Sequence, residues 1–290
     1  MRRIALALAL ASLATAAYAR GNHYGSHVRS DADRCSADDI QFDDGDTYVE
    51  KQVIDAGTLR SLKIAGDRSP ISVTGGSGSG YTVTVCKAAN SPEKLRDINV
   101  SVVGGEVKTS GPSSTHNWTV LYHITVPRGA NVDVSTENGP LALSDVDGTV
   151  VARAENGPLS LANVSGEVDA QTINGPISID GGAGRMTVKA SNGPLSIALD
   201  GDGWNGSLEA STKNGPLSIS VPRNFNSGVV VESDGRGPIS CRAEGCDRGW
   251  RMTRDGGDDG DEPRRIELGH GATAVHATTV NGPITIRDTQ

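Results

Sequence analysis

The chain has 290 residues, including 37 glycines, and only 3% of its residues are aromatic. This composition argues against a thick globular core and favours a thin, turn-rich all-β fold, because thick cores usually recruit Phe, Trp and Tyr. The formal net charge of -8 at pH 7 argues against nucleic acids and anionic membranes as partners.

Residues 1–19 have the parts of a secretory signal peptide. Met1-Arg2-Arg3 is basic, the apolar run Ile4 to Ala17 is short for a transmembrane helix, and Ala17-Tyr18-Ala19 fits an A-x-A cleavage site. We therefore expect an exported protein that begins at Arg20 and has no transmembrane segment. Loss of two arginines would move its net charge from -8 to about -10. The expected location is the periplasm, the outer membrane surface or the exterior.

Residues 20–54 are polar and rich in aspartate, and we expect an acidic, largely irregular N-terminal arm. The chain has four cysteines, which in an exported protein are expected to form two disulfides. Three connectivities are possible. The pairing we expect joins Cys241 to Cys246 in a small loop, which leaves Cys35 to pair with Cys86 and tie the arm to the first β region.

A β pattern begins near residue 55, where Arg68-Ser69-Pro70-Ile71 is interpreted as a degenerate first copy of a later repeat. Period-two alternation predicts further strands at 81–86, 98–103, 106–109 and 120–126. Gly104-Gly105 predicts a hairpin, and a short helical turn is expected within 90–96. The block 74–127 is therefore interpreted as an antiparallel insertion or an N-terminal cap.

From residue 128 the chain is dominated by Asn-Gly-Pro followed by an aliphatic residue. The first four copies are 18 residues apart, the next two steps are 22 residues each and lead to a variant at Arg236-Gly237-Pro238, and the last step is 45 residues. The predicted structural corners are Asn138, Gly139, Pro140, Asn156, Gly157, Pro158, Asn174, Gly175, Pro176, Asn192, Gly193, Pro194, Asn214, Gly215, Pro216, Asn281, Gly282 and Pro283.

Apolar or small residues stand six, four and two positions before each Asn, and aliphatic residues stand three and five positions after it. Each copy therefore predicts two short strands, one on either side of a corner, each with one buried face. Gly148, Gly166, Gly184 and Gly206 mark a second corner. We call one strand–corner–strand copy a coil.

Two packings fit this pattern, a row of hairpins or a β-solenoid in which each coil stacks on the one before it. Proline favours the solenoid, because the residue after Asn-Gly in a two-residue hairpin should donate an N–H that proline lacks. Equal spacing would place the asparagines above one another, where their amides could form a ladder. Hexapeptide left-handed helices are set aside because the apolar positions do not recur every six residues, and right-handed winding is the default for parallel crossovers.

The predicted fold is therefore all-β, a single-domain right-handed parallel β-solenoid with coils of about 18 residues and an N-terminal antiparallel hairpin block. The solenoid domain is expected over 55–290, with regular coils at 128–240, a cysteine-containing acidic insertion at 241–265 and the last coil at 266–290. The open ends of the stack need protection. We expect the hairpin block to guard one end and the disulfide loop to shield a side or the other end.

A signal peptide, a hairpin-rich opening, the segment Ile124 to Gly129 and serial Asn-Gly-Pro coils resemble the bacterial putative-adhesin β-solenoid domain family. This is a domain of unknown function related to the head domains of autotransporter adhesins. The resemblance covers residues 55–290 and implies an adhesive role, but it supplies no catalytic residues. The acidic insertion departs from the family pattern.

Candidate chemistry is sparse. The acidic loop offers Asp255, Asp258, Asp259, Asp261 and Glu262 as Ca²⁺ ligands, but it lacks the spacing of an EF-hand or of a calcium-binding β-roll. A solvated loop without cofactor is the simpler expectation.

The histidines are His23, His27, His116, His123, His270 and His276, of which the first two could bind a metal ion in the arm. None stands in a recognisable Ser-His-Asp motif. The outward residues Arg153, Asp169, Lys189 and Glu209 do not form one acidic row of the kind expected in a β-helical polysaccharide-cleaving enzyme.

Alternation also places Ser160, Ser178, Ser196 and Ser218 on one exposed face, which could dock a partner, a glycan or another copy of the chain, or could be an ordinary strand face. We expect a secreted, non-enzymatic cell-envelope protein that acts as an adhesin or scaffold and contacts proteins or glycans through flat sheet faces. The alternative is a carbohydrate-binding or carbohydrate-cleaving β-helix that uses carboxylates near the 241–265 insertion.

Overall fold

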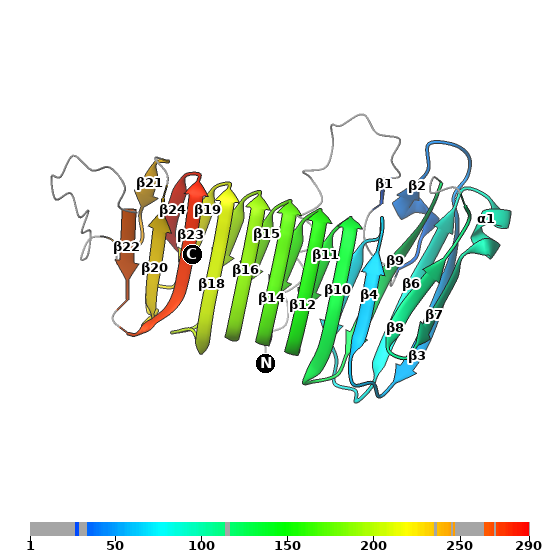
Figure 1. The fold of residues 1–290 in the computed structure, drawn as a ribbon, viewed down its shortest axis with the longest axis horizontal. Coiled ribbons are helices and arrows are strands. Elements are labelled where there is room, and N and C mark those ends of the chain that lie inside the picture. Colours follow the sequence, from blue (N-terminus) through cyan, green and yellow to red (C-terminus); the bar gives the residue numbers. More distant parts are fainter. Residues whose placement is uncertain are drawn as a thin grey trace, which may run out of the picture.

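The structure is a computed structural model that describes residues 27–28, 34–113, 117–234, 237–244, 246, 264–269 and 271–289. It is all-β, as predicted, with two large and mostly parallel sheets (Figure 1). The predicted signal peptide, the acidic loop 255–262 and Arg236 lie outside the described residues.

Sheet I has 11 strands in the spatial order β22-β20-β23-β18-β16-β14-β12-β10-β4-β8-β7. These strands are β4 (Leu62–Gly66), β7 (Asn99–Val103), β8 (Glu106–Ser110), β10 (Ala130–Asn138), β12 (Asp147–Asn156), β14 (Ser165–Asn174), β16 (Gly184–Asn192), β18 (Gly206–Asn214), β20 (Gly228–Ser233), β22 (Arg264–Leu268) and β23 (Thr273–Asn281).

Sheet II also has 11 strands, in the order β21-β24-β19-β17-β15-β13-β11-β5-β9-β6-β3. They are β3 (Tyr48–Gly57), β5 (Ile71–Gly75), β6 (Tyr81–Ala89), β9 (Trp118–Val126), β11 (Leu141–Ser144), β13 (Leu159–Ala162), β15 (Ile177–Asp180), β17 (Leu195–Ala198), β19 (Leu217–Val221), β21 (Ile239–Cys241) and β24 (Ile284–Asp288). The remaining described elements are β1 (His27–Val28), β2 (Ile40–Gln41), the 3-10 turn η1 (Ala37–Asp39) and helix α1 (Pro92–Asp97).

Each regular repeat contributes one strand to sheet I and the next strand to sheet II. Successive repeats pair in parallel at a shift of 18 residues, as Val150 with Val168 and Leu159 with Ile177 show. The two strands of one repeat lie in different sheets, which rules out a row of hairpins. The apolar positions of both sheets form one continuous buried cluster from Leu62 to Ile286, as the alternation of the sequence requires.

All six Asn-Gly-Pro copies lie between the end of a sheet I strand and the start of a sheet II strand. A Cβ atom added to Gly157 would lie 2.0 Å from the carbonyl oxygen of Gly139 in the preceding coil, so only glycine fits there. The backbone N–H of Leu141 donates to the carbonyl of Pro158 at 2.9 Å, across coils. The corner therefore needs no hydrogen bond within itself, and proline costs nothing there.

Buried threonine hydroxyls reinforce several corners from inside. Thr172 donates to the carbonyl of Gly157, Thr212 to that of Gly193 and Thr279 to that of Gly215, at 2.9–3.3 Å. Each threonine stands two residues before its asparagine. A buried hydroxyl needs a hydrogen-bond partner, and the glycine carbonyl of the neighbouring coil provides one.

The N-terminal block caps one end of both sheets (Figure 1). Strands β3, β6 and β9 run antiparallel at the end of sheet II, and the hairpin of β7 and β8 ends sheet I. Strands β6 to β9 and helix α1 confirm the predicted elements within 81–126. The degenerate copy at Arg68 is a corner as well, because β4 pairs with β10 and β5 with β11.

The prediction of an irregular arm as far as residue 54 is wrong from Tyr48 onward. Residues 48–57 form β3, the edge strand of sheet II, which pairs along its length with β6. The backbone groups on one side of β3 pair with β6, and Ile54 and Ala56 pack against the core. The residues from 34 to 47 contain only short elements.

The coils do not stack in chain order, which corrects the expectation that each coil lies on the one before it. Strands β23 and β24, the last in the chain, lie between β18 and β20 in sheet I and between β19 and β21 in sheet II. The last coil also begins at Thr273 and not at residue 266, because β22 pairs antiparallel with β20 at the end of sheet I.

The glycines of the Asn-Gly-Pro corners, which lie against one another in neighbouring coils, show the same order of coils. A Cβ on Gly282 would lie 1.9 Å from the oxygen of Gly215, and one on Gly237 would lie 2.2 Å from that of Gly282. The coil with the variant corner is therefore outermost, although it precedes the last coil in sequence.

Candidate functional site

A row of small residues runs across the outer face of sheet II. Ser178 and Ser196 are exposed, Ser160 and Ser218 are half-buried, and the Ser178 hydroxyl lies 3.2 Å from that of Ser160. The residues in register with this row in the flanking coils are Ala142 and Thr285. The structure therefore brings the predicted serines together in one row across neighbouring strands.

The outer face of sheet I carries charges of both signs. The guanidinium of Arg153 lies 3.7 Å from a carboxylate oxygen of Asp133 on one side and of Asp169 on the other, so it bridges three neighbouring coils. The Gln171 amide donates to Asp169 at 2.9 Å. These groups are about half exposed, so their pairing contributes little to stability and mainly sets the charge pattern of the face.

A shallow hollow of about 340 Å³ lies on this charged face, across β12, β14 and β16. Its lining residues are Thr149, Val150, Val151, Glu167, Val168, Asp169, Gln171, Arg185, Thr187 and Lys189. Glu167 and Asp169 supply carboxylates from β14, Arg185 and Lys189 supply cations from β16, and Val151 adds an apolar patch. We call this set the charged hollow.

The chemistry of the charged hollow suits a polar ligand. Register pairing places Arg185 beside Glu167 and Lys189 beside Gln171, so donors and acceptors alternate across the strands. Such a surface can hydrogen-bond hydroxyl or amide groups and can pair with a surface of mixed charge. Of the outward residues singled out in the sequence, Asp169 and Lys189 line the hollow and Arg153 contacts Asp169, whereas Glu209 belongs to another cluster.

The second cluster of charged side chains extends from the last coil to the strands on both sides of it. Both ring nitrogens of His276 on β23 face carboxylates, with Nδ1 2.9 Å from Oε2 of Glu209 on β18 and Nε2 3.0 Å from Oε2 of Glu232 on β20. Arg265 on β22 pairs with the other oxygen of Glu232 at 2.7 Å and with Glu267 at 2.6 Å. We call Glu209, His276, Glu232 and Arg265 the His276 cluster.

Electrostatics in the His276 cluster favour the charged forms. Partial burial disfavours the imidazolium, but the hydrogen bonds and charges of Glu232 and Glu209 outweigh it, and the pKa of His276 is raised. The hydrogen bond from His276 lowers the pKa of Glu232, and Arg265 adds to the effect. Sequence reasoning did not identify Glu232 as a candidate site residue. It included His276 only as one of six scattered histidines. Aligning the Asn281 coil with the Asn214 coil would have placed His276 beside Glu209, since each stands five residues before its asparagine.

His123 on β9 contacts a serine. Its Nδ1 lies 2.9 Å from the hydroxyl of Ser72, which also lies 3.2 Å from the carbonyl oxygen of Tyr122. Both contacts are satisfied when Ser72 donates to the carbonyl and the Nδ1–H donates to Ser72. That arrangement does not activate the hydroxyl as a nucleophile.

Within the described residues, no group of three or more His, Cys, Asp and Glu side chains is arranged to hold a metal ion. The proposed Ca²⁺ ligands Asp255, Asp258, Asp259, Asp261 and Glu262 lie outside these residues, as do His23, His116 and His270. For His27, only its place in β1 is described.

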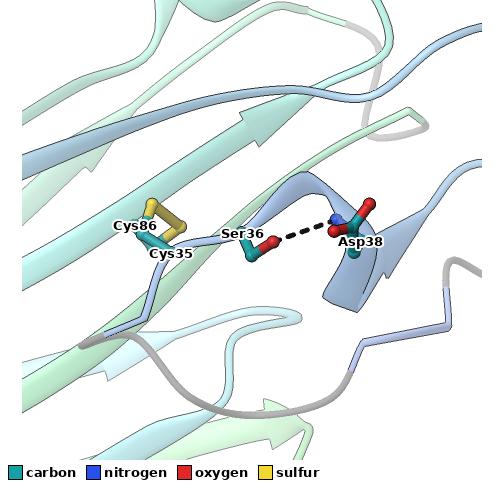
Figure 2. Close-up of a disulfide and its surroundings, with 4 residues drawn as sticks. All are labelled: Cys35, Ser36, Asp38 and Cys86. Carbon is teal, nitrogen blue, oxygen red and sulfur yellow. Dashed lines mark hydrogen bonds between the residues drawn. A yellow bond between two sulfur atoms is a disulfide. The ribbon is translucent and has the colours of Figure 1, made fainter.

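Both expected disulfides are present, Cys35–Cys86 and Cys241–Cys246. Figure 2 shows the first, together with the bond from the backbone N–H of Asp38 to the Ser36 hydroxyl that caps η1. Around Cys86, the buried Ile40, Ala88 and Leu121 form a small second apolar cluster, with Phe42 and Val49 packed against it. The disulfide therefore holds residues 35–42 against β6 and β9. Two disulfides fit an envelope or extracellular protein.

The part of the chain that the structure describes contains no helix that is both long and apolar enough to cross a membrane.

Comparisons with known proteins identify no family. No family model matches the chain, and no curated protein matches it. Several solved structures are similar in part. A Clostridium sporogenes protein named as a putative cell adhesion protein is 12% identical over 84% of this chain and 100% of its own, with a TM-score of 0.27. A Bacteroides fragilis putative adhesin is 11% identical over 83% of this chain and 97% of its own, with a TM-score of 0.33.

A Parabacteroides distasonis structure named as a putative lipid binding protein is 12% identical over 83% of this chain and 97% of its own, with a TM-score of 0.25. At these identities and TM-scores the likenesses assign no function to this chain.

Proposed function

We propose that this protein is an exported, non-enzymatic envelope protein in which a right-handed β-solenoid presents the charged outer face of sheet I to a protein or glycan partner. The charged hollow is the contact site. Arg185 and Lys189 supply cations, Glu167 and Asp169 supply carboxylates, and Val151 supplies an apolar contact.

The observation that supports this proposal best is the pairing of charges across neighbouring coils. Arg153 lies between Asp133 and Asp169, and Arg185 is in register with Glu167, so the charges spread along the sheet and do not converge on one atom. A spread pattern suits recognition of an extended surface, whereas catalysis requires groups directed at one reacting centre. Regular stacking fixes the spacing of these charges, because each strand is hydrogen-bonded on both sides.

The test is a binding assay with two matched charge-reversal variants. Arg185→Glu/Lys189→Glu reverses two cations of the charged hollow, and Arg96→Glu/Arg128→Glu reverses two exposed arginines that lie outside the strands of sheet I. The probes are a glycan array and immobilised bacterial outer-membrane proteins. We expect the unaltered protein and the control variant to bind one probe class and the hollow variant to lose at least tenfold in affinity. Equal binding by both variants, or no binding to either probe, would overturn the proposal.

Glycan cleavage is a second candidate, favoured by one observation within the described residues. Glu167 and Asp169 lie two residues apart on β14, and both line the hollow. A pair of carboxylic acids on one surface is the machinery that glycosidases use. Release of reducing ends from acidic and neutral polysaccharides, lost in both Glu167→Gln and Asp169→Asn, would support this candidate and contradict a non-enzymatic role.

A further inference from the structure

The C-terminal coil, β23 with β24, is an insert between two coils that precede it in sequence. In sheet I it separates β18 from β20, and in sheet II it separates β19 from β21. It therefore pairs with a coil on each side, and its removal would leave the facing strand edges of these two coils unpaired.

The contacts on the outer face of sheet I tie this insert to both neighbours through a single ring. His276 projects from the insert, and one ring nitrogen reaches Glu209 of the coil on one side while the other reaches Glu232 of the coil on the other. The distances, 2.9 and 3.0 Å, are those of hydrogen bonds.

Geometry also fixes the protonation state that this bridge needs. A neutral imidazole carries one N–H, so one of its nitrogens would present a lone pair to a carboxylate. Only the imidazolium donates from both nitrogens at once. The imidazolium therefore makes two charge-assisted hydrogen bonds, whereas the neutral ring makes one hydrogen bond and one repulsive contact.

The geometry points to a protonation-dependent latch, in which the imidazolium of His276 locks the C-terminal coil to both neighbouring coils and its deprotonation loosens that coil selectively. The charged groups that face the ring from the described elements are Glu209 on β18 and Glu232 on β20. Arg265 on β22 acts through Glu232 and itself pairs with Glu267. Arg265 keeps Glu232 in place when the ring is neutral. The C-terminal coil then loosens, while the ion pair between β22 and β20 remains.

The pH window follows from the directions of the shifts. The pKa of His276 is raised in the folded protein, so its contribution is complete at pH values below the pKa of an unfolded histidine and is lost as pH rises through the folded value. The pKa of Glu232 is lowered, so its contribution is present above the unfolded carboxyl pKa and is lost as pH falls through the folded value. The latch is closed in mildly acidic solution and opens toward alkaline pH.

Hydrogen exchange at about pH 6 and pH 8.5, corrected for intrinsic rates, tests the latch in the purified protein with its disulfides formed. We expect the protection of residues 273–288 to fall about tenfold at the higher pH, the size appropriate to two partly exposed charge-assisted bonds, while β14 changes little. His276→Gln should show the low protection at both pH values. The matched control His123→Gln should keep the pH response of the C-terminal coil.

Two results would overturn the latch. The first is equal loss of protection in the C-terminal coil and in β14, which would mean that the coil is not separable. The second is an unchanged pH response in His276→Gln, which would assign the response to another group. Nitrogen chemical shifts of His276 give an independent readout, because both ring nitrogens should be protonated at about pH 6, and a neutral ring there would also contradict the proposal.

Discussion

The side-chain amide of Asn281 donates to the side-chain oxygen of Asn214 at 2.9 Å, although 67 residues separate them. This bond continues a ladder in which Asn156 donates to Asn138, Asn174 to Asn156, Asn192 to Asn174 and Asn214 to Asn192. The ladder follows the spatial order of the coils, in which the last coil lies directly on the Asn214 coil.

Gly175→Ala should destabilise the protein by more than about 3 kcal/mol, because the new Cβ would lie 2.1 Å from the carbonyl oxygen of Gly157. The clash is with backbone that is fixed by hydrogen bonds on both sides, so it cannot be relieved by a rotamer change. Chemical denaturation measures the loss. Gly78→Ala is the control, since nothing lies within 4 Å of its added Cβ, and it should change stability by no more than about 0.5 kcal/mol.

Asn174→Asp should cost about 1 kcal/mol at pH 7, because a carboxylate cannot donate to Asn156 and faces its oxygen. The loss should shrink near pH 4, where a protonated carboxyl regains a donor. Thermal unfolding at both pH values measures the difference. Asn205→Asp, at an exposed position outside the ladder, supplies the same charge change, and an equal loss in that variant would refute a role for the ladder.

Removal of the Cys35–Cys86 disulfide with a Cys35→Ala/Cys86→Ala variant should cost up to about 4 kcal/mol, the chain-entropy expectation for a closure of 51 residues. Cys241→Ala/Cys246→Ala opens a separation of only 5 residues and should cost up to about 2 kcal/mol. Proteolysis should cut the first variant near residues 35–42 while the coils remain intact. A larger loss in the second variant would contradict this ranking.

Tyr122 should make the fold sensitive to high pH. Its ring is buried and its hydroxyl lies 2.5 Å from that of Thr109; burial raises the pKa of Tyr122 to about 12. The unfolded chain ionises first, near the ordinary value of 10, so stability is lost as pH rises from about 10 to 12, by about 2–3 kcal/mol. Unfolding free energies at pH 9 and pH 11.5 measure this slope. Tyr122→Phe should show a shallower slope, and an equal slope would assign the loss to other groups.

Local features were predictable from the sequence because each has a short-range cause. The alternation before and after Asn156 determines two strands with one buried face each, and proline at 158 rules out a tight hairpin. The same reasoning found helix α1 and the hairpin at Gly104-Gly105. It missed β3, because a polar edge strand such as Tyr48–Gly57 shows little alternation until its partner is known.

The candidate site also had parts that the sequence could predict and parts that it could not. Outward Arg153, Asp169 and Lys189 were identifiable from alternation, whereas their gathering in and beside one hollow depends on the exact register between coils. The His276 cluster was not identified, since His276 lies between Glu209 and Glu232 only because the last coil is inserted between β18 and β20.

The sequence by itself determined the coils, their corners and the residues that face inward, because an 18-residue period with Gly at each corner permits only close stacking of equivalent positions. Only the tertiary structure decided the order of the coils. Coils of equal period present nearly the same surface to one another, so local pattern does not say which is next to which. In the structure Asn281 bonds to Asn214 and Gly282 lies against Gly215, which places the last coil on the Asn214 coil.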